Sequence, residues 1–268
     1  AFAANHLGRL WVGGNLNDPH RLYYSTQSNH LELSATGAGD AGTLSVYPGA
    51  AQKLVGASSF KGFLVAFKYP RGVYYVDSRS PTIASWRVDQ INDQVGAAGP
   101  YAFTIVENDI MFLDTSGSFH LLSIVTEESK QTSNISQIAD MTQWFRDNVN
   151  MSLLNNARMV YYPQKREVHC AVAAVGSTVN NLRVIVDLNA QEPRFRVSDK
   201  DGCGAMWIRT NSDNLDEIAV GDSSGFVYRL DQAEKSIDGT GYESIFRTPF
   251  TDMSFVDPSL AVIEKNFG

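Results

Sequence analysis

The chain has 268 residues, of which 43% are hydrophobic and 19% are charged, so it carries enough apolar side chains to build a buried core. Its 22 Lys and Arg against 29 Asp and Glu give a formal net charge of −7, which argues against a protein that wraps nucleic acid. Two cysteines are too few for a disulfide framework or a cysteine-rich zinc module. The longest apolar runs are far shorter than the roughly 20 residues that cross a bilayer, and no basic-plus-apolar leader opens the chain, so we expect neither a membrane partner nor a signal peptide.

In chain order, apolar and polar residues alternate over short runs that end in Gly, Pro, Asn or Asp, which is typical of hairpins and meanders. The predicted strands are residues 10–12, 21–25, 63–67, 73–76, 101–106, 110–113, 118–122, 158–162, 167–172, 182–188, 194–197, 205–209, 217–220 and 226–230. The turns between them hold residues that tolerate a positive φ or fix φ. The sequence therefore predicts an all-β fold.

Residues 135–147 (ISQIADMTQWFRD) depart from this pattern and predict one inserted amphipathic helix, with Ser133 as its N-cap. The apolar residues on one helical face, at spacings of three and four, are Ile135, Ile138, Met141, Trp144 and Phe145. A helix that covers the end of a sheet is the favoured interpretation, and a helix that binds a partner is the alternative.

The strand groups form a weak repeat. Residues 114–122 (DTSGSFHLL) align with residues 222–230 (DSSGFVYRL), and residues 72–76 (GVYYV) look like the same element, so a turn glycine recurs at Gly72, Gly117 and Gly225. A period of roughly 45–55 residues, with three or four antiparallel strands each, is typical of a β-propeller blade. We predict a single β-propeller domain over residues 1–268, with about five to six blades and a helix inserted near residues 135–147. A β-sandwich is the alternative, but it needs roughly 100 residues per unit and no inner repeat.

Two short motifs resemble ligand loops only by their letters. Residues 37–42 (GAGDAG) match G-x-G-x-x-G, but the next residues read as a strand and turn instead of the helix that a phosphate site needs. Residues 198–202 (SDKDG), with Trp207 nearby, complete neither a calcium loop nor the Asp-box of sialidase-like propellers. We interpret the first as a surface loop and the second as a hairpin turn.

The remaining candidates for chemistry are scattered. The five histidines show no metal-binding spacing and are His6, His20, His30, His120 and His169. The strand-end carboxylates of Asp77, Asp114 and Asp222 are expected to bond the turn backbone. Cys170 and Cys203 are expected to be free thiols, with a disulfide between them left open. We assign no catalytic, cofactor-binding or metal-binding residues, expect no cofactor, and predict that the chain is not an enzyme.

Three tyrosine doublets follow the strand pattern, and their members are Tyr23, Tyr24, Tyr74, Tyr75, Tyr161 and Tyr162. Neighbouring residues of a strand face opposite sides of the sheet, so one tyrosine of each pair is expected to pack between sheets while the other faces outward. Ordinary packing is the favoured interpretation, and contact between subunits is the alternative. The sequence does not assign an interaction surface.

Several segments together resemble structural proteins of the tail and neck of tailed bacteriophages. They are residues 9–14 (RLWVGG), 19–25 (PHRLYYS), 60–68 (FKGFLVAFK), 73–76 (VYYV), 86–88 (WRV), 95–100 (VGAAGP) and 108–117 (NDIMFLDTSG), continued by residues 219–230 and 246–250. The order of these segments and their turn residues carry the resemblance, which is to the β-propeller part of a podophage nozzle or tubular tail protein, or of a related hub protein.

The resemblance implies a virion structural protein made in the cytoplasm of a host bacterium and located in the tail or neck. It implies a homo-oligomeric ring, commonly a hexamer, that contacts other tail and neck proteins and surrounds the DNA channel without binding DNA specifically. The net charge of −7 agrees with a channel that does not hold phosphates. The alternative is a propeller that acts on or binds glycans, such as a glycosidase or a lectin, with carboxylates at the mouth of the axis.

Overall fold

The computed structural model describes residues 1–27, 29–34, 41–48, 52–124, 130–134, 141–189, 193–199, 203–230, 236–237 and 240–241. The chain divides into two compact units, Ala1–Gln232 and Ala233–Gly268. The described residues of the second unit form β20 (Ser236–Ile237) and β21 (Thr240–Gly241), which pair antiparallel. The single β-propeller domain that the sequence predicts over residues 1–268 therefore stays a prediction.

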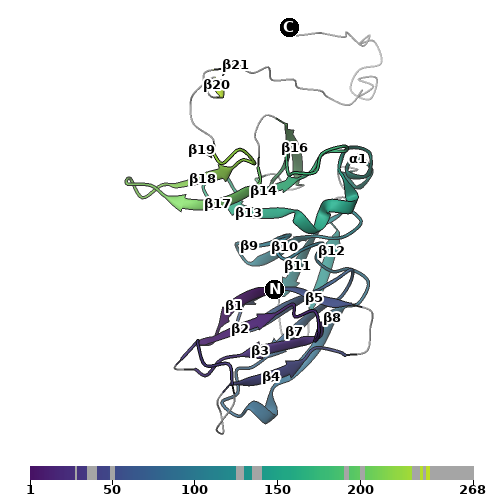
Figure 1. The fold of residues 1–268 in the computed structure, drawn as a ribbon, viewed down its shortest axis with the longest axis vertical. Helices are drawn as coiled ribbons and strands as arrows, with labels where there is room; N and C mark the ends of the chain where they lie inside the picture. The colour runs from purple at the N-terminus through teal and green to yellow at the C-terminus, as the bar shows by residue number, and fades with distance from the viewer. Residues whose placement is uncertain are drawn as a thin grey trace, which may run out of the picture. The chain divides into compact units, whose positions relative to one another are not determined.

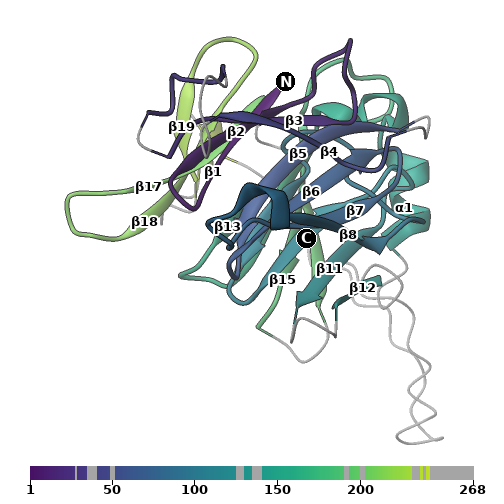
Figure 2. The same cartoon turned by 90° about the horizontal axis from the view of Figure 1, so that it is seen from below.

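The first unit is built from five antiparallel sheets, numbered here in chain order (Figure 1). Sheet 1 contains β1 (Phe2–His6), β2 (Arg9–Gly13), β3 (Arg21–Tyr24) and β4 (Gly42–Ser45). Sheet 2 contains β5 (Lys53–Phe60), β6 (Phe63–Tyr69), β7 (Val73–Asp77) and β8 (Arg87–Asn92), whose strands lie side by side in Figure 2. Sheet 3 contains β9 (Phe103–Val106), β10 (Asp109–Leu113), β11 (Phe119–Ile124) and β12 (Lys130–Asn134).

Sheet 4 contains β13 (Arg158–Tyr162), β14 (Glu167–Val172), β15 (Leu182–Asp187) and β16 (Arg194–Ser198). Sheet 5 has three described strands, β17 (Ala205–Thr210), β18 (Asp216–Gly221) and β19 (Val227–Arg229). Strands that follow one another in the sequence pair with one another, so each sheet is a meander. The prediction of a mostly β fold is therefore confirmed, whereas a propeller of five to six blades stays a prediction.

The hairpin between the first two strands of every sheet contains a residue in the left-handed region, where φ is positive. These residues are Leu7 (φ 48°), Lys61 (φ 47°), Glu107 (φ 49°), Arg166 (φ 51°) and Asn214 (φ 59°). In sheets 1 and 2 a glycine with positive φ, Gly8 or Gly62, follows at once. Two consecutive positive φ values are the mark of the tight hairpin turn that matches the right-handed twist of the strands. Each first hairpin thus holds a left-handed residue, whereas the tight turn with two of them is found in sheets 1 and 2.

Apolar clusters lie between consecutive sheets. Trp11 and Leu22 of sheet 1 pack with Leu64 of sheet 2, and Phe67 of sheet 2 packs with Phe112 of sheet 3. The largest cluster joins sheets 3 and 4 (members Met111, Leu113, Phe119, Val168, Cys170 and Val184), and a smaller one joins sheets 4 and 5 (members Tyr162, Ala171, Met206, Ile218 and Val220). Among the described residues, no such cluster joins sheet 5 to sheet 1.

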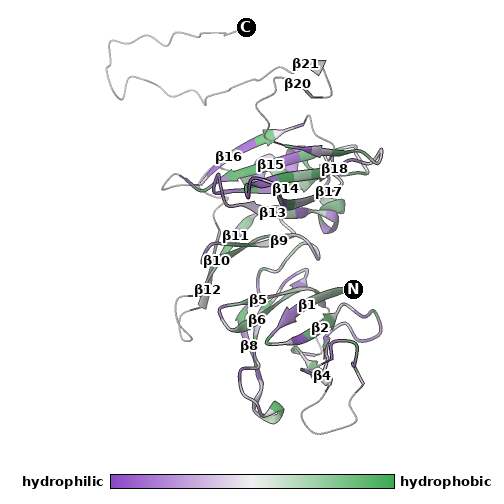
Figure 3. Ribbon diagram, turned by 90° about the vertical axis from the view of Figure 1, so that its left-hand side faces the viewer, coloured by the Kyte–Doolittle hydropathy of each residue, from purple (hydrophilic) through white to green (hydrophobic). Residues whose placement is uncertain are grey.

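The burial of residues along the second strand of a sheet indicates whether one or both faces of that sheet are covered. Every residue of β14, and every residue of β6 except the last, is buried, so both faces of these strands are packed. Figure 3 shows apolar residues along the strands of sheets 3 and 4. In β2, by contrast, Arg9, Trp11 and Gly13 are buried while Leu10 and Val12 are half-buried. Sheet 1 is therefore packed on one face by the described residues.

The inserted helix is confirmed only in part. Helix α1 spans Met141–Asn148, and residues 135–140 lie outside the described part of the chain. Ser133 pairs with Leu121 inside the ladder of β11 and β12, so its predicted role as an N-cap is wrong. Met141 and Phe145 are buried in the cluster between sheets 3 and 4, which makes α1 a cover for that core.

Candidate functional site

The most developed polar arrangement in the described residues is the turn that follows β10. Asp114 Oδ1 accepts hydrogen bonds from the backbone amides of Ser116 (2.8 Å) and Ser118 (2.9 Å) and from the Ser116 hydroxyl (2.7 Å). Asp114 Oδ2 lies 2.9 Å from Nε2 of His120. Burial acts to raise the pKa of Asp114, but the contacts with His120, Ser116 and Ser118 outweigh it and hold the pKa below its usual value.

An aspartate, a histidine and a serine meet here, but their geometry is not that of a nucleophile and its base. The Ser118 hydroxyl lies 3.0 Å from the hydroxyl of Thr142 on α1 and accepts a hydrogen bond from Ser116. The His120 ring stacks on Phe112 with 5.0 Å between centroids. Ser118 and His120 are only 3% and 5% exposed, so a substrate has no access to them. The arrangement therefore fastens the turn and α1 to sheet 3.

The aligned turn after β18 repeats this geometry. Asp222 Oδ1 accepts hydrogen bonds from the amides of Ser224 (2.9 Å) and Phe226 (2.8 Å), and Tyr228 donates to Oδ2 (3.2 Å) in place of the histidine. Asp77 likewise accepts hydrogen bonds from the backbone and the guanidinium of Arg79, and the guanidinium contact lowers its pKa to about 2. The prediction that these strand-end aspartates bond turn backbones is confirmed.

Sheet 2 carries a lysine at the position of this aspartate. The amide of Lys68 donates to the carbonyl of Gly72 at 2.8 Å, as the amide of Asp114 donates to the carbonyl of Ser118 at 2.9 Å. Gly72 therefore corresponds to Ser118, and the predicted alignment of Gly72 with Gly117 is wrong by one residue. The sequence analysis missed Lys68, although a lysine inside the apolar run of β6 (FLVAFKY) was a visible signal.

Lys68 is fully buried between sheet 2 and the loops of sheet 1. Its Nζ donates to the carbonyl of Tyr47 (2.9 Å), lies 3.3 Å from Nδ1 of His20, and sits 5.0 Å from the centre of the Tyr74 ring. Burial disfavours the charged form and lowers the pKa of Lys68 to about 8. Through these contacts Lys68 attaches two loops to the sheet. The burial of its charge lowers the free energy of unfolding.

We expect Lys68→Met to stabilise the protein at pH 7 and to remove one pH dependence. In the unfolded chain the lysine has a pKa near 10.5, whereas in the folded protein its pKa is about 8. The buried charge of Lys68 therefore lowers the free energy of unfolding of the wild type by about 3 kcal/mol below pH 8. This loss disappears as the pH rises from about 8 to 10.5, because the lysine is then neutral in both states. Because methionine also loses the bond to Tyr47, the gain at pH 7 is expected to be about 1–3 kcal/mol. Urea unfolding of both proteins at pH 7, 8, 9 and 10 measures it, and a difference that does not shrink above pH 8 contradicts it.

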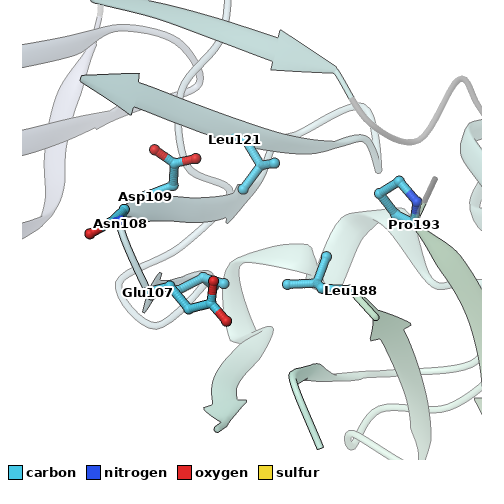
Figure 4. Close-up of a pocket in the computed structure, with 7 residues that line it drawn as sticks. Glu107, Asn108, Asp109, Leu121, Leu188 and Pro193 are labelled. Carbon is cyan, nitrogen blue, oxygen red and sulfur yellow. The ribbon is translucent and has the colours of Figure 1, made fainter. Parts of the chain in front are cut away.

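A shallow pocket of about 240 Å³ lies between sheets 3 and 4 (Figure 4). It is lined by Val106, Glu107, Asn108, Asp109, Leu121, Leu188 and Pro193. Ligand pockets usually measure roughly 300–1,000 Å³ and enclose most of their ligand. This pocket is therefore small for a glycan unit.

The two carboxylates of this pocket do not face each other in Figure 4. Glu107 accepts hydrogen bonds from Nε (2.7 Å) and a terminal nitrogen (3.2 Å) of Arg166 and from the hydroxyl of Tyr161 (3.0 Å). The bond from Arg166 is the main cause that lowers the pKa of Glu107, so this group stays ionised and is no proton donor near neutral pH. Glycoside hydrolysis needs a raised carboxyl pKa opposite a second carboxylate, which this geometry does not provide.

The motifs that resembled ligand loops gain no support. Gly42 opens β4, as the prediction of a following strand requires, and residues 37–40 lie outside the described part. Ser198 ends β16, and residues 200–202 also lie outside it. Cys170 and Cys203 are buried thiols that are not joined in a disulfide, as the sequence analysis expected. Burial raises the pKa of the Cys170 thiol, which makes it a poor nucleophile.

The tyrosine doublets follow the predicted division in two sheets. Tyr24 and Tyr162 are buried while Tyr23 and Tyr161 are half-buried. In sheet 2, however, Tyr74 and Tyr75 are 3% and 8% exposed, because both faces of that sheet are covered. The outward tyrosine of sheet 1, Tyr23, is held by a hydrogen bond from its hydroxyl to Asp18 (2.8 Å).

Within the described ranges, no three His, Cys, Asp or Glu side chains gather in a way that could hold a metal ion. None of the helices in the same part of the chain is both long enough and apolar enough to cross a membrane. No protein-family description matches the chain, and no curated protein matches it.

Proposed function

We propose that this chain is a structural protein of a tailed bacteriophage, located in the tail or neck of the virion, and that its sheets are the blades of a β-propeller. Copies of it form a ring, a hexamer by the resemblance described above, which surrounds the DNA channel and contacts other tail and neck proteins. The alternative of a glycan-acting propeller draws no support from the small pocket beside Glu107.

The observation that carries this proposal is the series of meander sheets that pack face to face in chain order. A blade of a propeller is one such meander, and it needs a neighbour on each face to cover its apolar residues. The matching turns of Asp114 and Asp222 support a repeat of one building block. The most developed polar clusters serve to hold turns, which suits a protein whose work is assembly.

Negative-stain electron microscopy of the purified protein, over a range of concentrations, tests the assembly. We expect closed rings of uniform copy number, and antibody labelling of purified virions is expected to mark the tail or neck. A protein that stays monomeric at high concentration and hydrolyses a glycan contradicts the proposal.

A protein that surrounds DNA without holding it is expected to bind duplex DNA weakly. The net charge of −7 disfavours phosphate contacts, so we expect a Kd no tighter than about 1 µM at physiological salt. Fluorescence anisotropy with a labelled duplex over a salt titration measures this affinity. Tight binding that falls steeply with salt contradicts a passive channel, because it shows many phosphate contacts.

A further inference from the structure

The interface between sheets 1 and 2 contains a buried histidine that bridges the two sheets. His6 ends β1 and is 2% exposed, and its Nδ1 lies 2.7 Å from the hydroxyl of Ser59 in β5. Its Nε2 is also buried and has no hydrogen-bond partner among the described residues. A neutral imidazole has one donor and one acceptor nitrogen, whereas an imidazolium has two donors and a charge. A proton added to His6 therefore enters a buried place where the described residues offer no acceptor for its second donor.

The charged groups near His6 offset such a proton only in part. The carboxylate of Asp77 attracts it, but this carboxylate already lies 2.8 Å from Arg79 and 3.5 Å from Arg87. Arg9, the cross-strand neighbour of His6 on β2, brings a positive charge on the same face of sheet 1. Burial outweighs the attraction of Asp77 and lowers the pKa of His6 to about 4.

A second histidine joins the same two sheets at the other end of their strands. His20 directly precedes β3, and its Nδ1 lies 3.3 Å from Nζ of Lys68, near the end of β6. Because an ammonium group can only donate, Nδ1 of His20 is the acceptor, and a proton on it breaks this contact and faces the charge of the lysine. Burial and, after it, the charge of Lys68 lower the pKa of His20. The charged neighbours of His20 in the chain, Asp18 and Arg21, pair with each other at 3.6 Å.

The buried histidines of sheets 3 and 4 have a different environment. Nε2 of His120 lies 2.9 Å from the carboxylate of Asp114, and Nε2 of His169 lies 3.2 Å from the carboxylate of Glu167. The other ring nitrogen of His169 lies 3.3 Å from a guanidinium nitrogen of Arg183. A carboxylate beside each of these rings stabilises the charged form. Mild acid therefore disturbs sheets 3 and 4 less than it disturbs the contact between sheets 1 and 2.

We propose that the contact between sheets 1 and 2 is an acid-sensitive joint, in which protonation of His6 and His20 separates sheet 1 while sheets 2 to 5 keep their packing. Separation opens the apolar cluster that the two sheets share, which includes Trp11 and Leu64. In a closed propeller the same event opens the circle of blades at one interface. The joint goes beyond the proposed function and does not depend on it.

Hydrogen exchange of the whole chain, followed by mass spectrometry from pH 7 to pH 4 and corrected for the intrinsic effect of pH on exchange, tests the joint. A separated sheet cannot cover its own apolar face, so we expect the peptides of sheet 1 to lose protection before those of the other sheets. His6→Asn and His20→Asn remove the titrating rings and keep a polar group beside Ser59 and Lys68. His30→Asn is the matched control, because His30 is an exposed histidine in the connection between β3 and β4 of the same sheet.

The expected size of the effect follows from the difference in protonation between the closed and the open joint. His6 has a pKa of about 4 in the closed joint and near 6.5 once it is exposed, so a fall in pH from 6.5 to 4 favours the open state by up to about 300-fold. We expect this rise in the wild type and in His30→Asn, and we expect His6→Asn to lose most of it. The rise is compared within each variant, so a general loss of stability does not imitate it.

Three results overturn the joint. The first is a rise in sheet 1 that is the same in His6→Asn as in the wild type, and the second is a loss of protection in all sheets at the same pH. The third comes from an NMR titration of the wild-type histidine rings, which also decides the matter if His6→Asn does not fold. We expect His6 to take up its proton only near pH 4, as the joint opens, and uptake near pH 6.5 in the closed protein contradicts the joint.

Discussion

Replacing Asp114 with alanine is expected to lower the free energy of unfolding by about 3–5 kcal/mol. Asp114 is 7% exposed, and its loss leaves the amide of Ser118, the hydroxyl of Ser116 and the ring of His120 without their acceptor in a buried place. The turn also fastens α1 through Ser118 and Thr142, so the loss reaches the core between sheets 3 and 4. Urea unfolding followed by circular dichroism measures the change.

The control is Asp222→Ala in the aligned turn. Asp222 accepts the same set of turn amides, but the residues around it, from Ser223 to Val227, are exposed, and water replaces the lost acceptor. We expect a loss of about 1 kcal/mol there. If Asp114→Ala and Asp222→Ala lower the free energy of unfolding equally, the burial of the hydrogen bonds around Asp114 is not the cause of the larger loss expected there.

Gly117→Val is expected to lower the free energy of unfolding by about 2–5 kcal/mol, more than Gly225→Val in the aligned turn. Both glycines have a positive φ, 84° and 91°, which disfavours any residue with a Cβ by roughly 1–2 kcal/mol. At Gly117 an added Cβ also lies 2.9 Å from the Cβ of Phe145, whereas at Gly225 nothing lies within 4 Å. The contact with α1 adds about 1–3 kcal/mol of overpacking at Gly117.

Melting temperatures of Gly117→Val, Gly225→Val and the double variant test this difference. The two sites lie in different sheets, so their effects are expected to add. Alanine at each position is the milder control, since it keeps the strain from positive φ and reduces the clash. If Gly225→Val proves as destabilising as Gly117→Val, packing against Phe145 is not the source of the difference.

The strands that the sequence predicted either alternate apolar with polar residues or, as in β6 (FLVAFKY), form a short apolar run between turn residues. The prediction missed β1, β5, β8, β12, β20 and β21. In β5 (KLVGASSF) the small residues hide the pattern, and at Gly56 the missing side chain leaves room for the ring of Phe103 in sheet 3. β12 (KQTSN) is a polar edge strand whose structure comes from pairing with β11 and not from its own apolar residues.

The polar sites were predictable only where their partners are close in the sequence. The turn of Asp114 could be predicted because the backbone amides that donate to its carboxylate belong to residues at most four positions away. The partners of Lys68 come from far along the chain, with His20 48 residues and Tyr47 21 residues away. Likewise Arg166 is 59 residues from Glu107. Only the packing of one sheet on the next brings such pairs together, and no local pattern encodes it.

The meander order of the sheets also bears on how this protein acquires its structure. Within each sheet every strand pairs with the strand that follows it, so most ladders close over a short connection and lose little chain entropy on forming. Long-range association enters only when one finished sheet covers the apolar face of the sheet before it. The chain is therefore suited to folding from its first residues onward during synthesis, one sheet at a time, each new sheet shielding the apolar face left open by the previous one.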